Sequence, residues 1–134
     1  MLKIDNIEEH LRNNKVNPSF QRIMIMKYLI DNNNHPTVDM IYQELKGTIS
    51  TLSKTTVYNT LKLLVENKVV NVLNIEDNEL RYDADTRVHG HFKCINCGNI
   101  LDLNIDISKL DIDLLSDIEI KEHHIYFKGY CNCK

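Results

Sequence analysis

The chain has 134 residues, of which 43% are hydrophobic, so it has enough apolar side chains for one ordinary domain or two small ones. No apolar run approaches the roughly 18 residues of a membrane span, and the first residues, MLKIDNIEEHLRNN, lack the apolar segment of a secretory signal. We therefore expect a globular, cytoplasmic protein. Its net charge of −3 gives no general basic surface for nucleic acid, so DNA binding would have to depend on local patches, helix N-termini and dimerisation.

The first part of the chain has the apolar spacing of α-helices. Residues 4–14 predict a short amphipathic helix. Residues 17–34 predict a second helix, with Pro18 in its first turn and a run of asparagines at its end. A third helix is expected to begin after Thr37, its N-cap, and to run to Gly47.

A fourth helix and a hairpin follow. Ser53 is a good N-cap and opens a helix over residues 54–67. The stripe of this helix that we expect to be buried consists of Val57, Leu61 and Leu64. Alternation with period two over residues 69–74 and 80–83, separated by the turn-forming residues 76–79, predicts a β-hairpin. Helix, loop, helix and hairpin in this order predict a winged helix-turn-helix.

In a domain of this kind, over residues 1–83, the helix after Ser53 is the recognition helix, and its first residues meet base edges and phosphates in the major groove. These candidate DNA-binding residues are Lys54, Thr55, Thr56, Tyr58 and Asn59. The alternative is that a polar helix start is the ordinary solvated face of a small domain. Net charge does not distinguish between these two interpretations. Residues 1–83 contain 10 Lys and Arg against 11 Asp and Glu, and residues 84–134 contain 6 against 8.

Residues 84–134 have a different pattern: short runs in which apolar and polar residues alternate, and all four cysteines. This pattern predicts a second small domain. Cys94-x-x-Cys97-Gly is the pattern of a zinc knuckle, and Cys131 with Cys133 supplies a second pair. Four thiolates would make a closed tetrahedral site for structural zinc. The alternatives are a redox Cys-x-x-Cys motif or four unconnected thiols.

The spacing of the second pair departs from a knuckle, because only Asn132 lies between Cys131 and Cys133. In an extended strand these two residues would share a face but lie about 7 Å apart. Either the chain bends at Asn132, or only one of the two cysteines is a zinc ligand.

His89 and His91 have no place in a saturated four-sulfur site. In a strand they would project on the same side, which suits a shared metal ion, and the carboxylates of Asp83 and Asp102 are near enough in sequence to converge with them. Paired histidines also commonly just flank the edge of a sheet.

Five segments in this order resemble the ferric uptake regulator (Fur) family of dimeric, metal-dependent bacterial repressors, from about residue 15 to residue 133. They are HPTVDMIYQELK, STLSKTTVYNTLKLLVENKVV, RYD, HGHFKCINCGNILDL and HHIYFKGYC. The resemblance implies an α+β protein, not an enzyme, in which a winged-helix DNA-binding domain precedes a small α/β dimerisation domain. It also implies a homodimer that binds double-stranded operator DNA.

The resemblance further implies a regulatory metal site for Fe2+ or Mn2+, at His35, Asp83, His89, His91 and Asp102. The aspartate at position 102 is typical of the peroxide-sensing PerR branch, in which Fe(II) promotes oxidation of a ligand histidine, here His35 or His89. The cysteines would then hold zinc and not act as the sensor.

The mixed nitrogen and oxygen donors of this set suit Fe(II) or Mn(II). With ligands on both sides of the expected domain boundary, the ion would fix the angle between the domains and couple metal binding to DNA binding. Two alternatives stay open: an iron-responsive Fur-type repressor, and, from a different class, a metalloenzyme that uses the His/Asp cluster to activate water.

Overall fold

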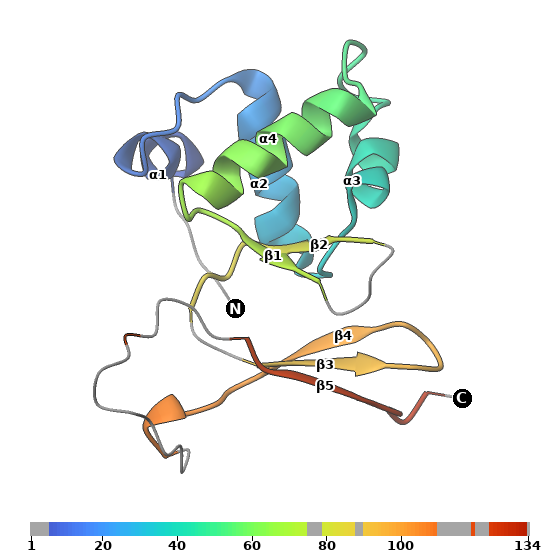
Figure 1. Cartoon of the computed structure of the whole chain (residues 1–134). Coiled ribbons are helices and arrows are strands. Elements are labelled where there is room, and N and C mark those ends of the chain that lie inside the picture. The colour runs from blue at the N-terminus through green and yellow to red at the C-terminus, as the bar shows by residue number, and fades with distance from the viewer. Residues whose placement is uncertain (1–5, 75–78, 88–89, 110–118, 120–123, 134) are drawn as a thin grey trace. The chain divides into compact units, whose positions relative to one another are not determined.

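The structure is a computed structural model that describes residues 6–74, 79–87, 90–109, 119 and 124–133. The chain divides into two compact units, residues 1–86 and residues 87–134, and each is described here by itself. Most described residues of the first unit are helical and the second unit contains a small sheet, so the fold is a mixed one (Figure 1). Among the described residues, no helix has both the length and the apolar composition to cross a membrane.

Four α-helices are present in the first unit where the sequence predicts them. They are α1 (Ile7–Asn13), α2 (Phe20–Asn32), α3 (Val38–Leu45) and α4 (Lys54–Glu66). Each begins after a residue whose side-chain oxygen accepts a hydrogen bond from a backbone N–H in the first turn, and both expected N-caps, Thr37 and Ser53, are confirmed. Pro18 lies outside α2 and not in its first turn, because Ser19 caps that helix through a hydrogen bond from the Arg22 backbone N–H.

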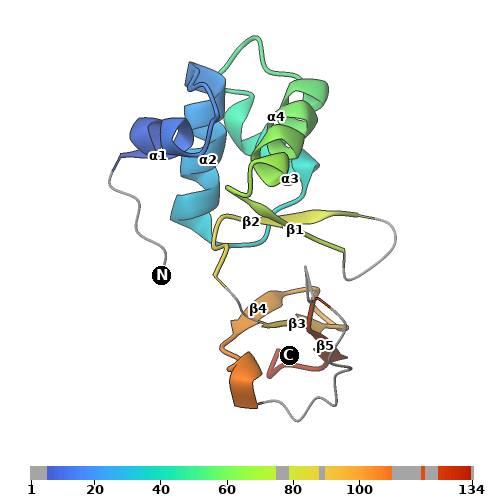
Figure 2. The same ribbon diagram turned by 60° about the vertical axis from the view of Figure 1, so that its left-hand side comes forward.

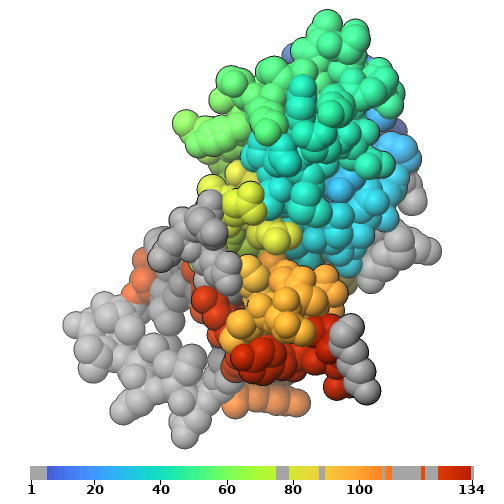
Figure 3. Space-filling view, turned by 90° about the vertical axis from the view of Figure 1, so that its right-hand side faces the viewer, coloured from blue at the N-terminus to red at the C-terminus, as the bar shows by residue number. Residues whose placement is uncertain are grey.

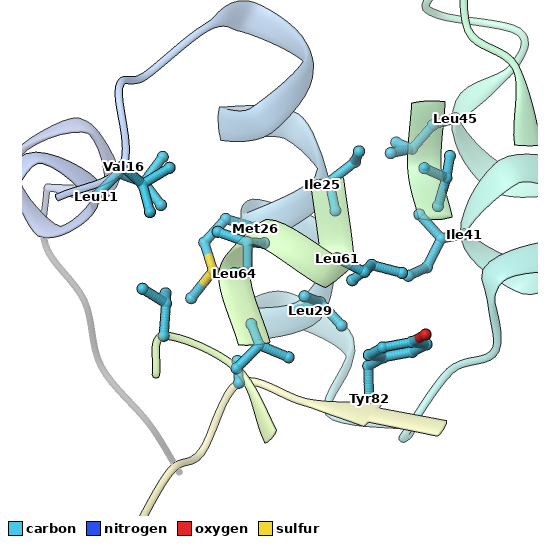
Figure 4. Close-up of a cluster of buried hydrophobic side chains, with 14 of the residues drawn as sticks. Leu11, Val16, Ile25, Met26, Leu29, Ile41, Leu45, Leu61, Leu64 and Tyr82 are labelled. Carbon is cyan, nitrogen blue, oxygen red and sulfur yellow. The ribbon is translucent and has the colours of Figure 1, made fainter. Parts of the chain in front are cut away.

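The core of the first unit is built between α2, α3 and α4 (Figure 4). The stripe expected on α4 is buried completely, at 0% exposure for each of Val57, Leu61 and Leu64. It packs in one cluster with Ile25 of α2 and Ile41 of α3. Since the apolar face of α4 is turned into this core, the polar residues at the start of the helix are left on the surface.

Two short antiparallel strands complete the first unit: β1 (Asn71–Leu73) and β2 (Arg81–Asp83). Figure 2 shows them beneath the helices of the unit. They confirm the two strands of the expected hairpin, whereas residues 76–78 of its turn lie outside the described residues. A backbone hydrogen bond of 3.0 Å from the Tyr82 N–H to the Pro36 carbonyl attaches β2 to the loop that precedes α3.

In the described part of the second unit, three strands form a sheet in the order β4-β3-β5: β3 (Gly90–Cys94), β4 (Ile100–Leu103) and β5 (Tyr126–Gly129). β3 is antiparallel to β4 and parallel to β5, and β3 and β5 lie side by side in the space-filling view, in orange and red (Figure 3). A short 3-10 helix, η1 (Ile107–Lys109), follows β4.

The register of this sheet sorts its side chains onto two faces, because directly paired residues project on the same side. Phe92 pairs with Leu101 on one neighbour and with Phe127 on the other. His91, one residue earlier, pairs with Asp102 and with Tyr126. One face therefore carries an apolar row and the opposite face carries a histidine beside a carboxylate.

Candidate metal centres and nucleic-acid interface

The first cysteine pair lies on a tight turn between β3 and β4. Cys94 is the last residue of β3, and its carbonyl accepts a hydrogen bond of 2.9 Å from the Gly98 N–H. Gly98 has a φ of 78°, in the left-handed region that glycine adopts without steric cost. The turn brings the Cys97 backbone N–H to 3.4 Å from the Cys94 sulfur, as expected for a zinc knuckle.

The second cysteine pair follows β5, and the chain bends at Asn132. This is the bend that the Cys131-Asn132-Cys133 spacing requires. The Cys94 and Cys133 sulfur atoms are 3.5 Å apart, and those of Cys97 and Cys131 are 3.6 Å apart. All four sulfurs lie within 4.8 Å of one another, and these described cysteines form no disulfide.

The dimensions of this cluster fit a zinc ion. Four sulfurs at about 2.3 Å from zinc in a tetrahedron are separated by about 3.8 Å, close to the two sulfur–sulfur distances above. A side-chain amide also reaches the cluster, since Asn96 Nδ2 donates to the Cys133 sulfur at 3.5 Å. Amide groups that donate to ligand sulfurs orient them and spread their negative charge.

The thiols of the cluster differ strongly in acidity. Hydrogen bonds from the backbone N–H groups of Cys131 and Cys97 lower the pKa of Cys94 to about 5. Hydrogen bonds with the sulfurs of Cys133 and Cys94 raise the pKa of Cys131 to about 12, because they stabilise its protonated thiol. A divalent cation binds thiolates and displaces such a proton, so metal binding at this donor set is coupled to proton release.

The first unit holds a histidine and a carboxylate side by side. His35 Nε2 lies 3.5 Å from Asp83 Oδ2, and both side chains are almost fully buried. His35 has a φ of 49°, which is uncommon for a residue other than glycine and marks a backbone that its surroundings hold in place. Arg81 Nη1 donates to the His35 carbonyl at 3.2 Å, so β2 positions both members of the pair.

The second unit holds a matching pair. His91 Nε2 lies 3.4 Å from Asp102 Oδ1, across the antiparallel ladder of β3 and β4. Each pair thus offers an imidazole nitrogen and a carboxylate oxygen, which are donors that Fe(II) and Mn(II) accept. His89, the fifth residue expected in the regulatory site, lies outside the described residues.

The residues expected to contact DNA gather at the start of α4. Lys54, Thr55, Tyr58 and Asn59 are exposed and Thr56 is partly buried. They project away from the core.

The amino group of Lys54 is 2.7 Å from Asp39 Oδ1, a partner that the sequence does not predict. Residues 39 and 54 lie on different helices, so no local spacing rule links them. The sequence likewise does not predict the contacts of Arg81 with His35 and of Asn96 with Cys133, because these partners are also far apart in the chain.

Comparison with known proteins places this chemistry in a class of metal-responsive regulators. The profile of the ferric uptake regulator family matches residues 13–128, and the chain belongs to that family. A curated relative, the peroxide-responsive repressor PerR of Staphylococcus epidermidis, is 34% identical over 118 residues, which cover 85% of this chain and 79% of the relative.

Solved structures agree with the family assignment. The chain resembles PerR from Streptococcus pyogenes, described for peroxide sensing and gene regulation, with a TM-score of 0.55, 28% identity and coverage of 96% of this chain and 90% of that one. Its fold also matches the Helicobacter pylori ferric uptake regulator, which has three functional metal-binding sites, with a TM-score of 0.74, 19% identity and coverage of 98% and 95%.

Proposed function

We propose that this chain is a metal-dependent transcriptional repressor that binds operator DNA as a homodimer and senses peroxide through oxidation of a ligand histidine. The observation that carries the proposal is the pairing of His35 with Asp83 and of His91 with Asp102 in a chain 34% identical to a protein named as a peroxide-responsive repressor. The hydrophobic core cluster of the first unit includes neither His35 nor Asp83.

The regulatory metal site consists of His35, Asp83, His89, His91 and Asp102. Their nitrogen and oxygen donors would hold Fe(II) or Mn(II), which both accept such a mixed donor set. Bound Fe(II) supplies the redox chemistry that Mn(II) does not. With Fe(II) held by these residues, peroxide would oxidise the imidazole of His35 or His89: the O–O bond and a ring C–H bond would break, one oxygen would be inserted at that carbon and the other would leave as water.

The buried positions of His35 and Asp83 support their part in this site. A left-handed backbone at His35, a hydrogen bond from Arg81 and the adjacent carboxylate together fix the direction of the imidazole. A ligand held in this way does not have to be ordered when the metal binds, which favours affinity. Conversion of the imidazole to its oxidised form removes a ligand and weakens metal binding.

The second metal site is structural zinc, held by Cys94, Cys97, Cys131 and Cys133. The sulfur–sulfur distances of 3.5 and 3.6 Å and the depressed pKa of Cys94 support it. Cys94 ends β3, and Cys131 and Cys133 follow the end of β5. The ion therefore links the C-terminal ends of these two parallel strands. A saturated zinc site leaves the thiols unavailable as peroxide sensors.

DNA binding belongs to residues 1–83, which lie within the first unit, as a winged helix-turn-helix, with α4 as the recognition helix and the β1–β2 hairpin as the wing. The candidate contacts are Lys54, Thr55, Thr56, Tyr58 and Asn59, which form the polar, exposed start of α4. Each metal-loaded subunit of a dimer then presents one recognition helix to a half-site.

Dimerisation belongs to residues 84–134. The apolar row on the sheet supports it, since Leu101 and Phe127 are 48% and 50% exposed and flank Phe92. A second copy that covers this row removes apolar surface from water.

The experiment that tests the function is mass spectrometry of the Fe(II)- and Mn(II)-loaded protein after brief exposure to dilute peroxide, with operator binding measured in parallel. We expect one added oxygen on the peptide of His35 or His89, with Fe(II) only, together with loss of DNA binding. Unmodified histidines in a protein that still releases DNA on chelation would instead establish an iron-responsive repressor.

A further inference from the structure

Lys54, the first residue of the proposed recognition helix, is held by groups of the preceding helix. Its amino group is 2.7 Å from Asp39 Oδ1. Gln43 Nε2 donates to the same carboxylate oxygen at 3.4 Å, and the ring centroid of Tyr42 lies 5.8 Å from the Lys54 amino group. A carboxylate and an aromatic face of α3 thus converge on Lys54 at the start of α4, and the Gln43 amide orients that carboxylate.

The electrostatic environment at the start of α4 favours a Lys54 side chain that is paired with a carboxylate. A cation in the first turn of a helix is opposed by the helix dipole, whereas an aspartate in the first turn of α3 is favoured by it. The hydrogen bond between the two side chains lowers the pKa of Asp39 and raises that of Lys54. Both side chains remain about half exposed, at 51% and 57%, so the pair is open to competition by an external anion.

We propose that Asp39 limits sequence-independent DNA binding by holding Lys54 away from phosphate and by placing a negative charge beside the start of α4. The proposal rests on the proposed function, and it assigns Asp39 as a specificity-determining residue of that interface. A lysine that pairs with a phosphate releases bound counterions and strengthens binding to every sequence alike. A lysine that is already paired adds little, while base contacts by its neighbours are unaffected.

The overall charge of the first unit is consistent with this role. The first unit, residues 1–86, carries 10 basic against 12 acidic side chains, so one lysine at the interface is a considerable share of the positive charge available for phosphate. Restraint of that lysine lowers binding to the many non-specific sites more than binding to an operator read through base edges.

The competing explanation is that the ion pair only joins α3 to α4. The two roles differ in what they change. A pair that serves the fold alone contributes to the free energy of unfolding and leaves the salt dependence of DNA binding as it is. A pair that restrains a phosphate contact changes the salt dependence, because the number of phosphates neutralised rises when the restraint is lost.

The test compares Asp39→Asn with Asp31→Asn in the full-length, Mn(II)-loaded protein. Asp31 is a matched control, since it pairs with Lys27 at 3.0 Å on α2 and is exposed to a similar degree. Each substitution removes one negative charge and one exposed ion pair. Binding to a duplex of scrambled sequence and to the operator is measured by fluorescence anisotropy at several salt concentrations.

We expect Asp39→Asn to bind the scrambled duplex several-fold more tightly at low salt. The slope of log affinity against log salt should steepen by about 0.9, the value for one more phosphate contact. The ratio of operator affinity to scrambled affinity should fall, and Asp31→Asn should follow the wild-type protein in slope. In the double variant Asp39→Asn with Lys54→Gln, the slope should return to the wild-type value.

An unchanged slope for Asp39→Asn in a wild-type protein that binds its operator overturns this inference and leaves the proposed function standing. An equal increase for Asp31→Asn also overturns it, because net charge alone would then be the cause. Failure of the metal-loaded wild-type protein to bind any duplex overturns the proposed function, and the inference with it.

Discussion

The sulfur atoms of Cys94 and Cys133 lie 3.5 Å apart although 39 positions separate the two residues in the chain. The parallel pairing of β3 with β5 brings them together, because it places Gly129 opposite Cys94 and lets the chain after β5 turn back over the knuckle. The sheet of the second unit and its thiolate cluster therefore depend on each other.

Removal of zinc should open the β3–β5 pairing. Without the cation, only weak contacts between the sulfurs join the two cysteine pairs, and structural zinc contributes folding free energy directly. We expect a strong thiol-competing chelator to abolish hydrogen-exchange protection in β3 and β5 while α2 and α4 keep theirs. Full protection of β5 in demonstrably zinc-free protein would contradict the prediction.

Asn96 should slow the loss of zinc. Its amide donates to the sulfur of Cys133, the ligand nearest the end of the described chain, and substitution of such outer partners typically weakens metal binding by about 10- to 100-fold. Asn96→Ala should therefore transfer zinc to a chromogenic chelator about 10-fold faster or more. Asn99→Ala is the control, an exposed asparagine of the same turn; equal rates for the two variants would show that Asn96 has no such role.

Zinc affinity should rise with pH. In the metal-free site the Cys94 thiol, with its pKa lowered to about 5, is ionised at neutral pH, whereas Cys131, with its pKa raised to about 12, is protonated. Zinc must displace that proton, so apparent affinity should fall by about tenfold per pH unit of acidification for each proton displaced. Competition titrations between pH 6 and 8 measure the slope, and a flat profile would refute the assignment of a protonated thiol.

Arg81 should contribute to the regulatory metal site and not to the zinc site. Its guanidinium donates to the carbonyl of His35, whose φ of 49° needs support. Arg81→Ala should lower Mn(II) affinity by about 10-fold with zinc content unchanged. Arg22→Ala is the matched control, because Arg22 Nη1 also donates to a backbone carbonyl, that of Asn17 at 2.7 Å. Isothermal titration calorimetry measures the Mn(II) affinity of both variants, and equal affinities would contradict the prediction.

Much of the first unit is predictable from local sequence. Thr37 and Ser53 cap α3 and α4 as expected, because a capping side chain bonds to an N–H only three residues away. The buried stripe of α4 follows from the helical period. The expectation that Pro18 lies in the first turn of α2 is wrong, because Ser19 caps that helix and Pro18 precedes the cap.

Residue types and their spacing also determine the chemistry of this protein: thiolates for zinc, imidazoles beside carboxylates for Fe(II) or Mn(II), and the motifs of the ferric uptake regulator family. Tertiary structure alone decides which of these groups meet. The bend at Asn132, the left-handed backbone at His35 and the pairing of Asp39 with Lys54 arise between residues far apart in the chain or through backbone angles that residue type leaves open. Local propensities fix what each segment forms, whereas packing of distant segments fixes the distances at which their side chains can act.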